Sequence, residues 1–443
     1  MSYLDNIFFG ILLILGFSFF AINIKKIIRN IKLGQDVNRK NDAGLRWKNM
    51  AYIALGQSKM VKKPISGILH IIVYVGFVII NLELLEIVID GLFGTHRVFA
   101  PLGVVYNFLI ASFEILAVLV LIAVFAFYAR RNIIKLKRFA SSDLKGWPKS
   151  DANYILYFEV VLMSLFLLMN ASDFHLQNLS GGFGHYIKAG SFPISSLIAP
   201  IFNGMEAHAV EMLERTFWWL HITGILIFLN YLYFSKHLHI LLAFPNTYFA
   251  DLNPLGQLDD LPAVTKEVKL MMDPNADPFA AAPINENPVP SKFGAQDVQD
   301  LNWVQLLNAY TCTQCGRCTD ACPANITGKK LSPRKIMIDT RNRLEEVGKN
   351  IDKNKGIFIP DNKTLLNDYI TPEELWACTS CNACVQECPV NISPLSIILD
   401  MRRYLVMEQS AAPQSVNAMM SNIENNGAPW QYNQQDRLNW KNE

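Results

Sequence analysis

Long apolar runs dominate the first part of this 443-residue chain, and no run of that length follows residue 245. Five runs are long enough to cross a bilayer, which needs about 20 mostly apolar residues; they cover residues 7–28, 65–89, 103–129, 153–173 and 215–236. The first run has no basic residue before it and no small-x-small cleavage site, so we interpret it as a retained helix and not as a signal peptide. The pattern predicts an all-α membrane bundle of five transmembrane helices over residues 1–244.

Basic residues are unevenly divided among the loops that join these runs. Segments 25–63 and 130–149 carry eleven and seven Lys and Arg, whereas the two loops on the opposite side carry one each, Arg97 and Lys188. Because basic loops stay on the cytoplasmic side, we predict a multi-pass protein of the bacterial inner (cytoplasmic) membrane. Its amino terminus is expected outside, and the part after the fifth run is expected in the cytosol.

Composition changes after the fifth run. Residues 245–297 contain eight prolines, a density that is typical of an extended connector and disfavours a long helix. Residues 298–409 contain all eight cysteines of the chain, and residues 410–443 form a polar tail with Trp430 and Trp440. Tryptophans on a polar tail favour docking to a partner polypeptide.

The cysteines form two runs with the same spacing, C-x2-C-x2-C-x3-C-P. This is the spacing of bacterial ferredoxins with two clusters, in which the fourth cysteine of each run ligates the other cluster. Zinc sites usually pair C-x2-C knuckles, and disulfides require an oxidising compartment, so both alternatives suit the sequence less well. We therefore predict a mainly α-helical 2[4Fe–4S] ferredoxin-like domain over 298–409. One cluster is assigned to Cys312, Cys315, Cys318 and Cys388, and the other to Cys322, Cys378, Cys381 and Cys384.

Histidines within or beside the apolar runs indicate a further cofactor site, because imidazoles are rare in membrane helices. His70 lies near the cytosolic end of the second run, and His221 and His239 lie 18 residues apart on the fifth. In a regular helix residues 18 apart share one face, whereas His237 points away. We predict that His70 and His239 bind one b-type haem near the cytosolic surface. The alternative, an interfacial anchor, suits His237 better because Lys236 is its neighbour.

Four acidic residues fall inside the apolar runs and are candidate proton carriers for a quinone site. Glu83 and Glu86 lie on the second run, Glu114 on the third and Glu159 on the fourth. Pairing with interfacial cations is an equally good explanation for three of them. Glu114 is the hardest to explain in that way because it lies near the middle of its run.

The runs G-I-L-H-I-I-V-Y-V-G-F and W-W-L-H-I-T-G-I-L-I-F resemble the five-helix cytochrome b of the nitrate reductase gamma-subunit type, and its relatives in membrane heterodisulfide reductases. The run W-V-Q-L-L-N-A-Y-T-C-T-Q-C-G-R-C is similar to the iron–sulfur half of the D-type heterodisulfide reductase proteins. The resemblance implies electron transfer between a cytosolic redox partner and membrane menaquinone, through both clusters and a haem b bound by His70 and His239. An electron-transfer flavoprotein is one donor that the resemblance implies.

Two departures from the family pattern change this picture. Nitrate reductase gamma subunits bind a second haem between the equivalent of His221 and a histidine on the second helix, where this chain has Ile80 and Asn81. His221 is therefore only a candidate ligand of a second haem. The family's CCG repeats are not present, so we expect a separate CCG-repeat-type subunit to supply the catalytic part.

No catalytic residue is assigned, because the chain also lacks a G-x-G-x-x-G dinucleotide fingerprint, and no nucleic acid is expected as a partner. The sequence thus predicts an electron-transfer subunit of a quinone-linked oxidoreductase. The alternative is a redox-sensing or partner-recruiting membrane iron–sulfur protein without quinone turnover.

Overall fold

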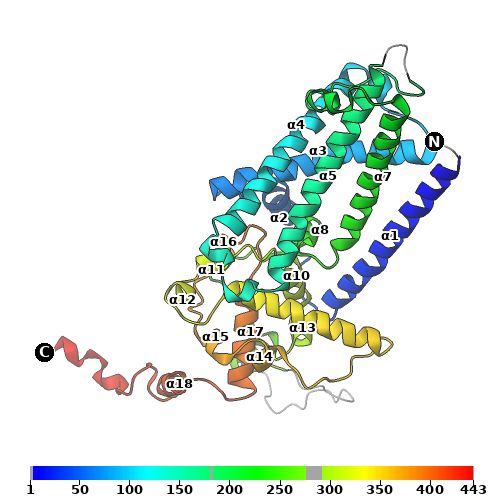
Figure 1. Cartoon of the computed structure of the whole chain (residues 1–443). Helices are drawn as coiled ribbons and strands as arrows, with labels where there is room; N and C mark the ends of the chain where they lie inside the picture. The colour runs from blue at the N-terminus through cyan, green and yellow to red at the C-terminus, as the bar shows by residue number, and fades with distance from the viewer. Residues whose placement is uncertain (1–2, 180–182, 276–291, 443) are drawn as a thin grey trace.

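The computed structural model describes residues 3–179, 183–275 and 292–442. Within these ranges the chain is helical, and its β-type pairing is limited to isolated bridges such as Gln35 with Asn302. Long helices form a bundle at one end of the molecule, and short helices form a compact cysteine domain at the other (Figure 1).

Four helices of the bundle are long and apolar enough to cross a membrane. A fifth helix, α7, is long and apolar enough only when the following segment Lys236–Tyr248 is counted with it, and this segment is bent by 91° from α7. Helix α5 packs against α4 and α7, α3 packs against α4, and α1 lies between α3 and α7. The helices are α1 (Tyr3–Ile31), α3 (Pro64–Phe93), α4 (Val104–Tyr128), α5 (Trp147–Gln177) and α7 (Ala207–Tyr231).

The outer surface of this bundle is apolar. Side chains such as Ile14, Leu82 and Phe125 are 68%, 48% and 59% exposed. Helices that present large apolar side chains to their surroundings over their whole length are typical of a membrane protein. The expectation of an all-α membrane domain is thus supported, with four uninterrupted helices and one broken helix in place of five regular ones.

The break in the fifth helix lies between Tyr231 and Lys236. The Ser235 hydroxyl accepts a hydrogen bond from the His237 N–H at 3.0 Å and caps the turn that follows. Asp151 of α5 holds both sides of the break, because its carboxylate accepts from the Tyr231 hydroxyl at 2.6 Å and from the Lys236 N–H at 3.1 Å. The premise of a regular helix through His239 is therefore wrong. The chain turns here and continues as α8 (His239–Tyr248).

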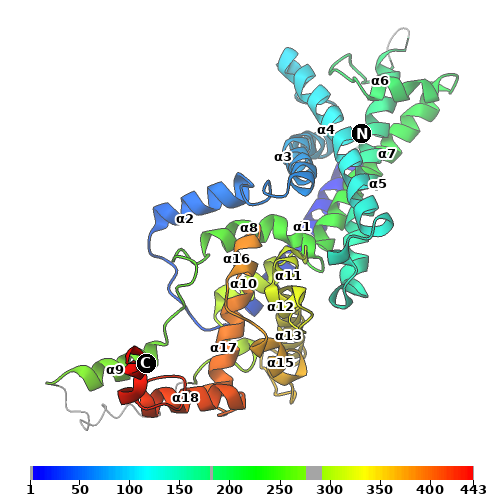
Figure 2. The same cartoon turned by 90° about the vertical axis from the view of Figure 1, so that its left-hand side faces the viewer.

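Helix α8 lies between the bundle and the cysteine domain, beside α2 (Ala43–Met50) (Figure 2). It also packs on α10, the first helix of the cysteine domain. The bend therefore creates a layer of helices that separates the two parts of the molecule and contacts both.

The cysteine domain is built from one long helix, α13, and several short ones. Helix α10 begins at a capping box in which Asn302 and Gln305 satisfy each other's backbone N–H groups. Helix α13 has Pro333 in its first turn and Ser332 as its N-cap, and it packs against α10 and α17. The helices are α10 (Trp303–Thr311), α11 (Arg317–Asp320), α12 (Pro323–Ile326), α13 (Pro333–Lys353), α14 (Leu365–Asp368), α15 (Pro372–Trp376), α16 (Ala383–Glu387) and α17 (Pro394–Met407).

One hydrophobic core joins the two parts. Leu162 and Phe228 of the bundle belong to the same buried cluster as Leu306, Ile336 and Leu344 of the cysteine domain. The hydrophobic core is therefore continuous across the boundary between the two predicted domains.

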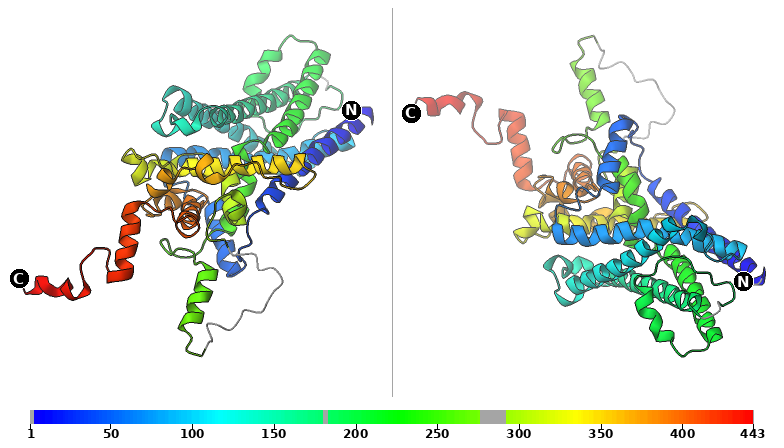
Figure 3. Two further views of the ribbon diagram at one scale, coloured as in Figure 1. Left: turned by 90° about the horizontal axis from the view of Figure 1, so that it is seen from below. Right: turned by 90° about the horizontal axis from the view of Figure 1, so that it is seen from above.

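Helix α9 of the connector and the described part of the tail lie at the periphery (Figure 3). The proline-rich connector contains an 11-residue helix, α9 (Pro262–Met272), which the proline density did not predict. Its proline stands at the first helical position, where the missing N–H would have no partner in any case. The tail forms α18 (Gln414–Asn426) and η9 (Gln434–Lys441) and extends away from the body (Figure 1).

Candidate cofactor sites

The eight cysteines gather in two adjoining cavities of the cysteine domain. Each cavity contains three cysteines of one run and the fourth cysteine of the other, and Cys384 lines both. All eight are free thiols. The first cavity is lined by Cys312, Cys315, Cys318, Cys384 and Cys388, and the second by Cys322, Cys378, Cys381 and Cys384.

The two runs repeat each other in backbone conformation as well as in spacing. Gln314 and Ser380, each two residues after the first cysteine, have φ of 58° and 55°. Gly316 and Asn382, each four residues after it, have φ of 79° and 60°. Left-handed residues at these points curl each loop around its cavity.

Gly316 also leaves room for the neighbouring Arg334 side chain. A Cβ atom at this position would lie 2.5 Å from Nη1 of Arg334.

Backbone N–H groups point at two of the sulfur atoms. The Ser380 N–H donates to the Cys378 Sγ at 3.4 Å, and the Ile392 N–H donates to the Cys388 Sγ at 3.3 Å. Hydrogen bonds of this kind stabilise a thiolate and tune the potential of a bound cluster.

Iron can bind these buried thiols only if they lose their protons. Burial raises the pKa of Cys312 and Cys384 to about 12 and that of Cys388 to about 11. Iron must therefore displace protons from these groups when it binds. A [4Fe–4S] cluster takes four cysteine ligands, and each cavity is lined by the four cysteines of one proposed cluster.

One cysteine of the second cavity, Cys381, is exposed, whereas the other seven cysteines are buried or half-buried. The first cavity lies against the loop before α3, because the Arg317 guanidinium donates to the carbonyls of Lys59 at 3.1 Å and Met60 at 3.3 Å.

Lys59 returns this contact. Its Nζ donates to the carbonyls of Val385 and Cys388, both at 3.2 Å. Both cysteine runs are thereby tied to the same short loop.

His70 and His239 lie close together where the bundle meets this layer. Their ring centres are 6.4 Å apart, and the planes are tilted by 46°. An imidazole nitrogen binds a first-row metal at about 2 Å and lies roughly 1 Å from its own ring centre, so two rings on opposite sides of one metal have centres about 6 Å apart. The observed spacing suits two axial ligands of a haem.

Hydrogen bonding of one of the two rings suits this role. The Nδ1 of His239 donates to the Lys236 carbonyl at 3.1 Å, which leaves its Nε2 free to bind a metal. The Nδ1 of His70 is buried and has no hydrogen-bond partner among the described residues. His237 does not point away as a regular helix requires; its ring centre is 5.3 Å from that of His239 and 5.4 Å from that of Phe228.

Lys236 connects this pair to the first cysteine run. Its Nζ donates to the Gln314 side chain at 2.8 Å and to the Pro148 carbonyl at 2.5 Å. Gln314 lies between the first two cysteines of that run. The Lys236 side chain thus links the segment that carries His237 and His239 to the first cavity.

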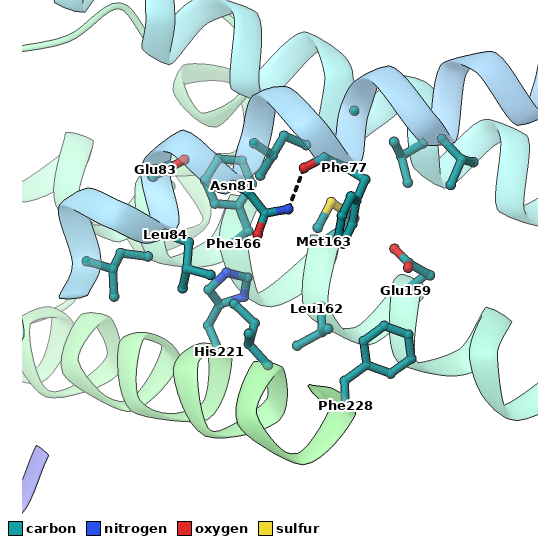
Figure 4. A pocket seen from close by; sticks show the side chains of 16 residues that line it. Phe77, Asn81, Glu83, Leu84, Glu159, Leu162, Met163, Phe166, His221 and Phe228 are labelled. Atoms are coloured by element: carbon teal, nitrogen blue, oxygen red, sulfur yellow. Dashed lines mark hydrogen bonds between the residues drawn. The ribbon is translucent and has the colours of Figure 1, made fainter. Parts of the chain in front are cut away.

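His221 lies in a different cavity, between α3, α4, α5 and α7 (Figure 4). Its Nδ1 is buried without a hydrogen-bond partner in the described part of the chain. On α3 this cavity is lined by Ile80 and Asn81, where a second histidine ligand would be needed. His221 is the sole histidine among the residues that line the cavity. A second haem with two histidine ligands does not fit here.

The acidic residues fall into two groups. Glu83 and Glu159 line the cavity of His221. Glu114 instead accepts hydrogen bonds from the N–H groups of Ile194 at 2.8 Å and Ser195 at 3.1 Å, at the start of the short helix α6 (Ser195–Ile198). This contact satisfies one carboxylate oxygen of Glu114, whereas the other, Oε1, is buried and has no hydrogen-bond partner among the described residues.

Glu86 has a comparable structural role. Its carboxylate accepts from the Phe99 N–H and from the Tyr106 hydroxyl, both at 2.9 Å.

A buried polar cluster at the end of the bundle far from the cysteines was not predicted. Arg97 is 7% exposed; its Nε donates to the Asp173 carboxylate at 2.8 Å and its Nη2 donates to Asn170 at 2.8 Å. The one signal in the sequence was a single arginine in an outer loop that otherwise lacks Lys and Arg.

Comparisons with known proteins agree with this arrangement. The family described as 4Fe-4S dicluster domain matches residues 311–392, so the chain contains such a domain. The chain is 31% identical over 460 residues to the Probable iron-sulfur-binding oxidoreductase FadF of Bacillus subtilis, with 96% of this chain and 59% of that protein covered. It is 26% identical over 434 residues to the EtfAB:quinone oxidoreductase of Syntrophomonas wolfei, with 92% and 55% covered. No solved structure matches the chain.

Components of heterodisulfide reductases also match, as the sequence resemblance suggested. One component of the Ferredoxin/F(420)H(2)-dependent CoB-CoM heterodisulfide reductase of Methanosarcina acetivorans is 31% identical over 121 residues, which is 27% of this chain and 60% of that component. The relatives are iron–sulfur electron-transfer oxidoreductases or their components, and a general role in electron transfer follows. The chain spans a little over half the length of the first two relatives.

Proposed function

We propose that this protein relays electrons between a cytosolic redox partner and the menaquinone pool of the bacterial inner membrane. The observation that carries the proposal is the row of sites along one molecule. It starts at the exposed Cys381, continues through the two adjoining cysteine cavities, and reaches the His70–His239 pair where the bundle begins. The orientation is that of the positive-inside rule, with the cysteine domain in the cytosol and the amino terminus outside.

In this proposal Cys312, Cys315, Cys318 and Cys388 hold one [4Fe–4S] cluster, and Cys322, Cys378, Cys381 and Cys384 hold the other. His70 and His239 hold haem b. When bound, these groups supply a series of one-electron carriers. The protein's own contribution is their spacing and their insulation from water, because all these residues except Cys381 are buried or half-buried.

The donor is proposed to be an electron-transfer flavoprotein, which would approach the surface at Cys381. The support is the likeness to a protein named EtfAB:quinone oxidoreductase. A CCG-repeat-type subunit is the second proposed partner. Its docking surface is the tail, where Trp430 and Trp440 are 50% and 72% exposed.

The test is a single-turnover experiment on the full chain in lipid nanodiscs. The clusters are reduced anaerobically with a flavoprotein, and the appearance of reduced haem b and of menaquinol is followed by absorbance and by extraction. We expect both to appear in sequence, and we expect His70→Ala to block menaquinol formation while the clusters remain reducible. Menaquinol formation at the same rate in His70→Ala would refute the route, and complete absence of menaquinol in the wild type would favour the redox-sensing alternative.

A further inference from the structure

The cavity around His221 has the character of a site for a flat apolar ring. Its walls include Phe77, Leu84, Met163 and Phe166, which surround the space in Figure 4. The empty space, with its opening to the surface included, is about 670 Å³. Phe77 is 43% exposed on the outside of the bundle, so the cavity can be reached from the lipid.

Polar groups are few in this cavity, and two of them are unsatisfied. His221 and Glu83 are 4% and 3% exposed, and the His221 Nδ1 and the Glu83 Oε2 have no hydrogen-bond partner among the described residues. Glu159 contributes a second carboxylate, which faces the same space from the other end (Figure 4). Buried polar atoms without partners are uncommon in folded proteins and point to a ligand that supplies them.

We propose that this cavity binds the ring of the membrane quinone, with His221 as hydrogen-bond donor to one carbonyl oxygen and Glu159 beside the other. The inference rests on the proposed quinone-linked function and adds the place of the reaction to it. A quinone suits the cavity because it combines a flat apolar ring with one polar atom at each end. A haem does not, because α3 places Ile80 and Asn81 opposite His221.

Reduction of a quinone to a quinol consumes two electrons and two protons, and each carbonyl becomes a hydroxyl group. The electrons come from the two clusters, which a reduced flavoprotein refills. The protons need a separate path, because the cavity walls are apolar.

Glu83 provides the start of such a path, because it lines both this cavity and the polar cluster at the far end of the bundle. Its Oε1 is 3.9 Å from the Nη1 of Arg97, which also binds Asp173. The other oxygen of Asp173 is 3.6 Å from the Nε2 of His96, and the His96 ring centre is 5.0 Å from that of the exposed His185. Protons therefore reach the cavity from the end of the bundle opposite the cysteine domain.

The binding test uses the full chain with its clusters and haem in nanodiscs, and the fluorescent quinone-site ligand 2-heptyl-4-hydroxyquinoline N-oxide as probe. Ile80→Trp fills the cavity and should weaken probe binding at least tenfold. Val78→Trp is the matched control on the same helix; Val78 is 49% exposed and does not line the cavity, so affinity should change less than twofold. His221→Leu, which keeps the volume apolar, should weaken binding at least fivefold.

Haem absorbance and iron content must stay unchanged in all three variants, which guards against misfolding. Unaltered probe binding in both Ile80→Trp and His221→Leu would overturn the inference, even if the wild type reduces menaquinone. Loss of one of two haems in His221→Leu would also overturn it, because the cavity would then be a haem site. A wild type that neither binds the probe nor forms menaquinol would instead refute the proposed function.

The role of Glu83 is tested by separating binding from turnover. Glu83→Gln should slow menaquinol formation at saturating menaquinone at least tenfold, a larger factor than its effect on probe affinity. Glu83→Asp keeps a titratable carboxyl and should restore a large part of the rate. Equal rates in the wild type and in Glu83→Gln would exclude this proton path.

Discussion

Arg334 holds the cysteine domain against the loop that joins α4 and α5, and its replacement by methionine is a direct test of this docking. The guanidinium is 1% exposed. Its Nε and Nη2 donate to the two carboxylate oxygens of Asp143 at 2.9 and 2.8 Å, and its Nη1 donates to the Arg138 carbonyl at 2.7 Å. Arg334 also lines the first cysteine cavity, so the contact is next to a proposed cluster.

The expected cost follows from what Arg334→Met leaves behind. Asp143 has only 8% of its side chain exposed, so its charge would remain buried without a cation. Removal of one partner from a buried pair costs about 3–5 kcal/mol. At about 1.4 kcal/mol for each factor of ten, the docked state should lose between two and three and a half powers of ten in its equilibrium constant.

Amide hydrogen exchange of the loop 137–144 measures this change on the intact protein. Opening of the loop should become faster or more frequent by that factor in Arg334→Met. Lys330→Met is the control, because Lys330 and Glu373 form a pair whose side chains are 66% and 62% exposed. Exposed pairs contribute about 0–1 kcal/mol, so exchange in this control should hardly change.

A double variant and a pH series complete the test. Arg334→Met combined with Asp143→Leu should be more stable than Arg334→Met alone, because no buried charge remains. Burial alone would raise the pKa of Asp143, but hydrogen bonds from Arg334 and Ser141 lower it below its usual value. A carboxyl with a lowered pKa stabilises the folded state above its ordinary pKa of about 4 and loses this effect as the pH falls through the lowered value.

The difference between wild type and Arg334→Met should therefore be largest at high pH and shrink as the pH falls through the pKa of Asp143 in the variant, which burial without Arg334 raises above its usual value of about 4. Unchanged loop exchange in Arg334→Met at pH 7 would refute the reasoning, as would a double variant whose loss equals the sum of both single losses.

Three further predictions concern the cofactors and the tail. Anaerobic analysis should give about eight iron and eight sulfide per chain, and Cys388→Ala should damage the cluster of the first run; stoichiometric zinc would contradict this. His70→Ala or His239→Ala should each abolish the low-spin haem absorbance, whereas His237→Ala should retain it; the reverse outcome would make His237 the ligand. Truncation after Gln409 should leave haem and cluster spectra intact, because the hydrogen bonds of the tail beyond Pro413 stay within it; spectral loss would show that the tail supports a site.

The sequence was sufficient wherever a single stretch of chain determines the outcome. The apolar run 7–28 became α1 and the run 65–89 became α3, because bilayer length and hydropathy alone define such a helix. The cysteine spacing likewise predicted a dicluster domain, and the family comparison confirmed it.

Features that depend on distant contacts were not predictable. The stretch around Ser235 continues the helical pattern, and the bend after Tyr231 is fixed by Asp151, which lies on another helix. The Arg97–Asp173 contact joins residues 76 positions apart, so the local sequence around either residue does not indicate the other as its partner. The contacts of the candidate proton carrier Glu114 were not predictable, because its backbone partners at Ile194 and Ser195 lie 80 and 81 positions away.

The hydrophobic core that runs through both parts of the molecule has a consequence for biogenesis. Leu306 and Ile336 are fully buried against a cluster that includes Leu162 and Phe228 of the membrane helices. The cysteine segment is synthesised after the membrane helices, so these helices are available when its own core forms. A cysteine fragment expressed without them would leave part of that core open to water, and its cluster loops would lose the support of Lys59 and Lys236. Cluster insertion is therefore expected to follow membrane insertion. The cysteine domain would fold against the completed helix bundle, and its loops would then bind the clusters.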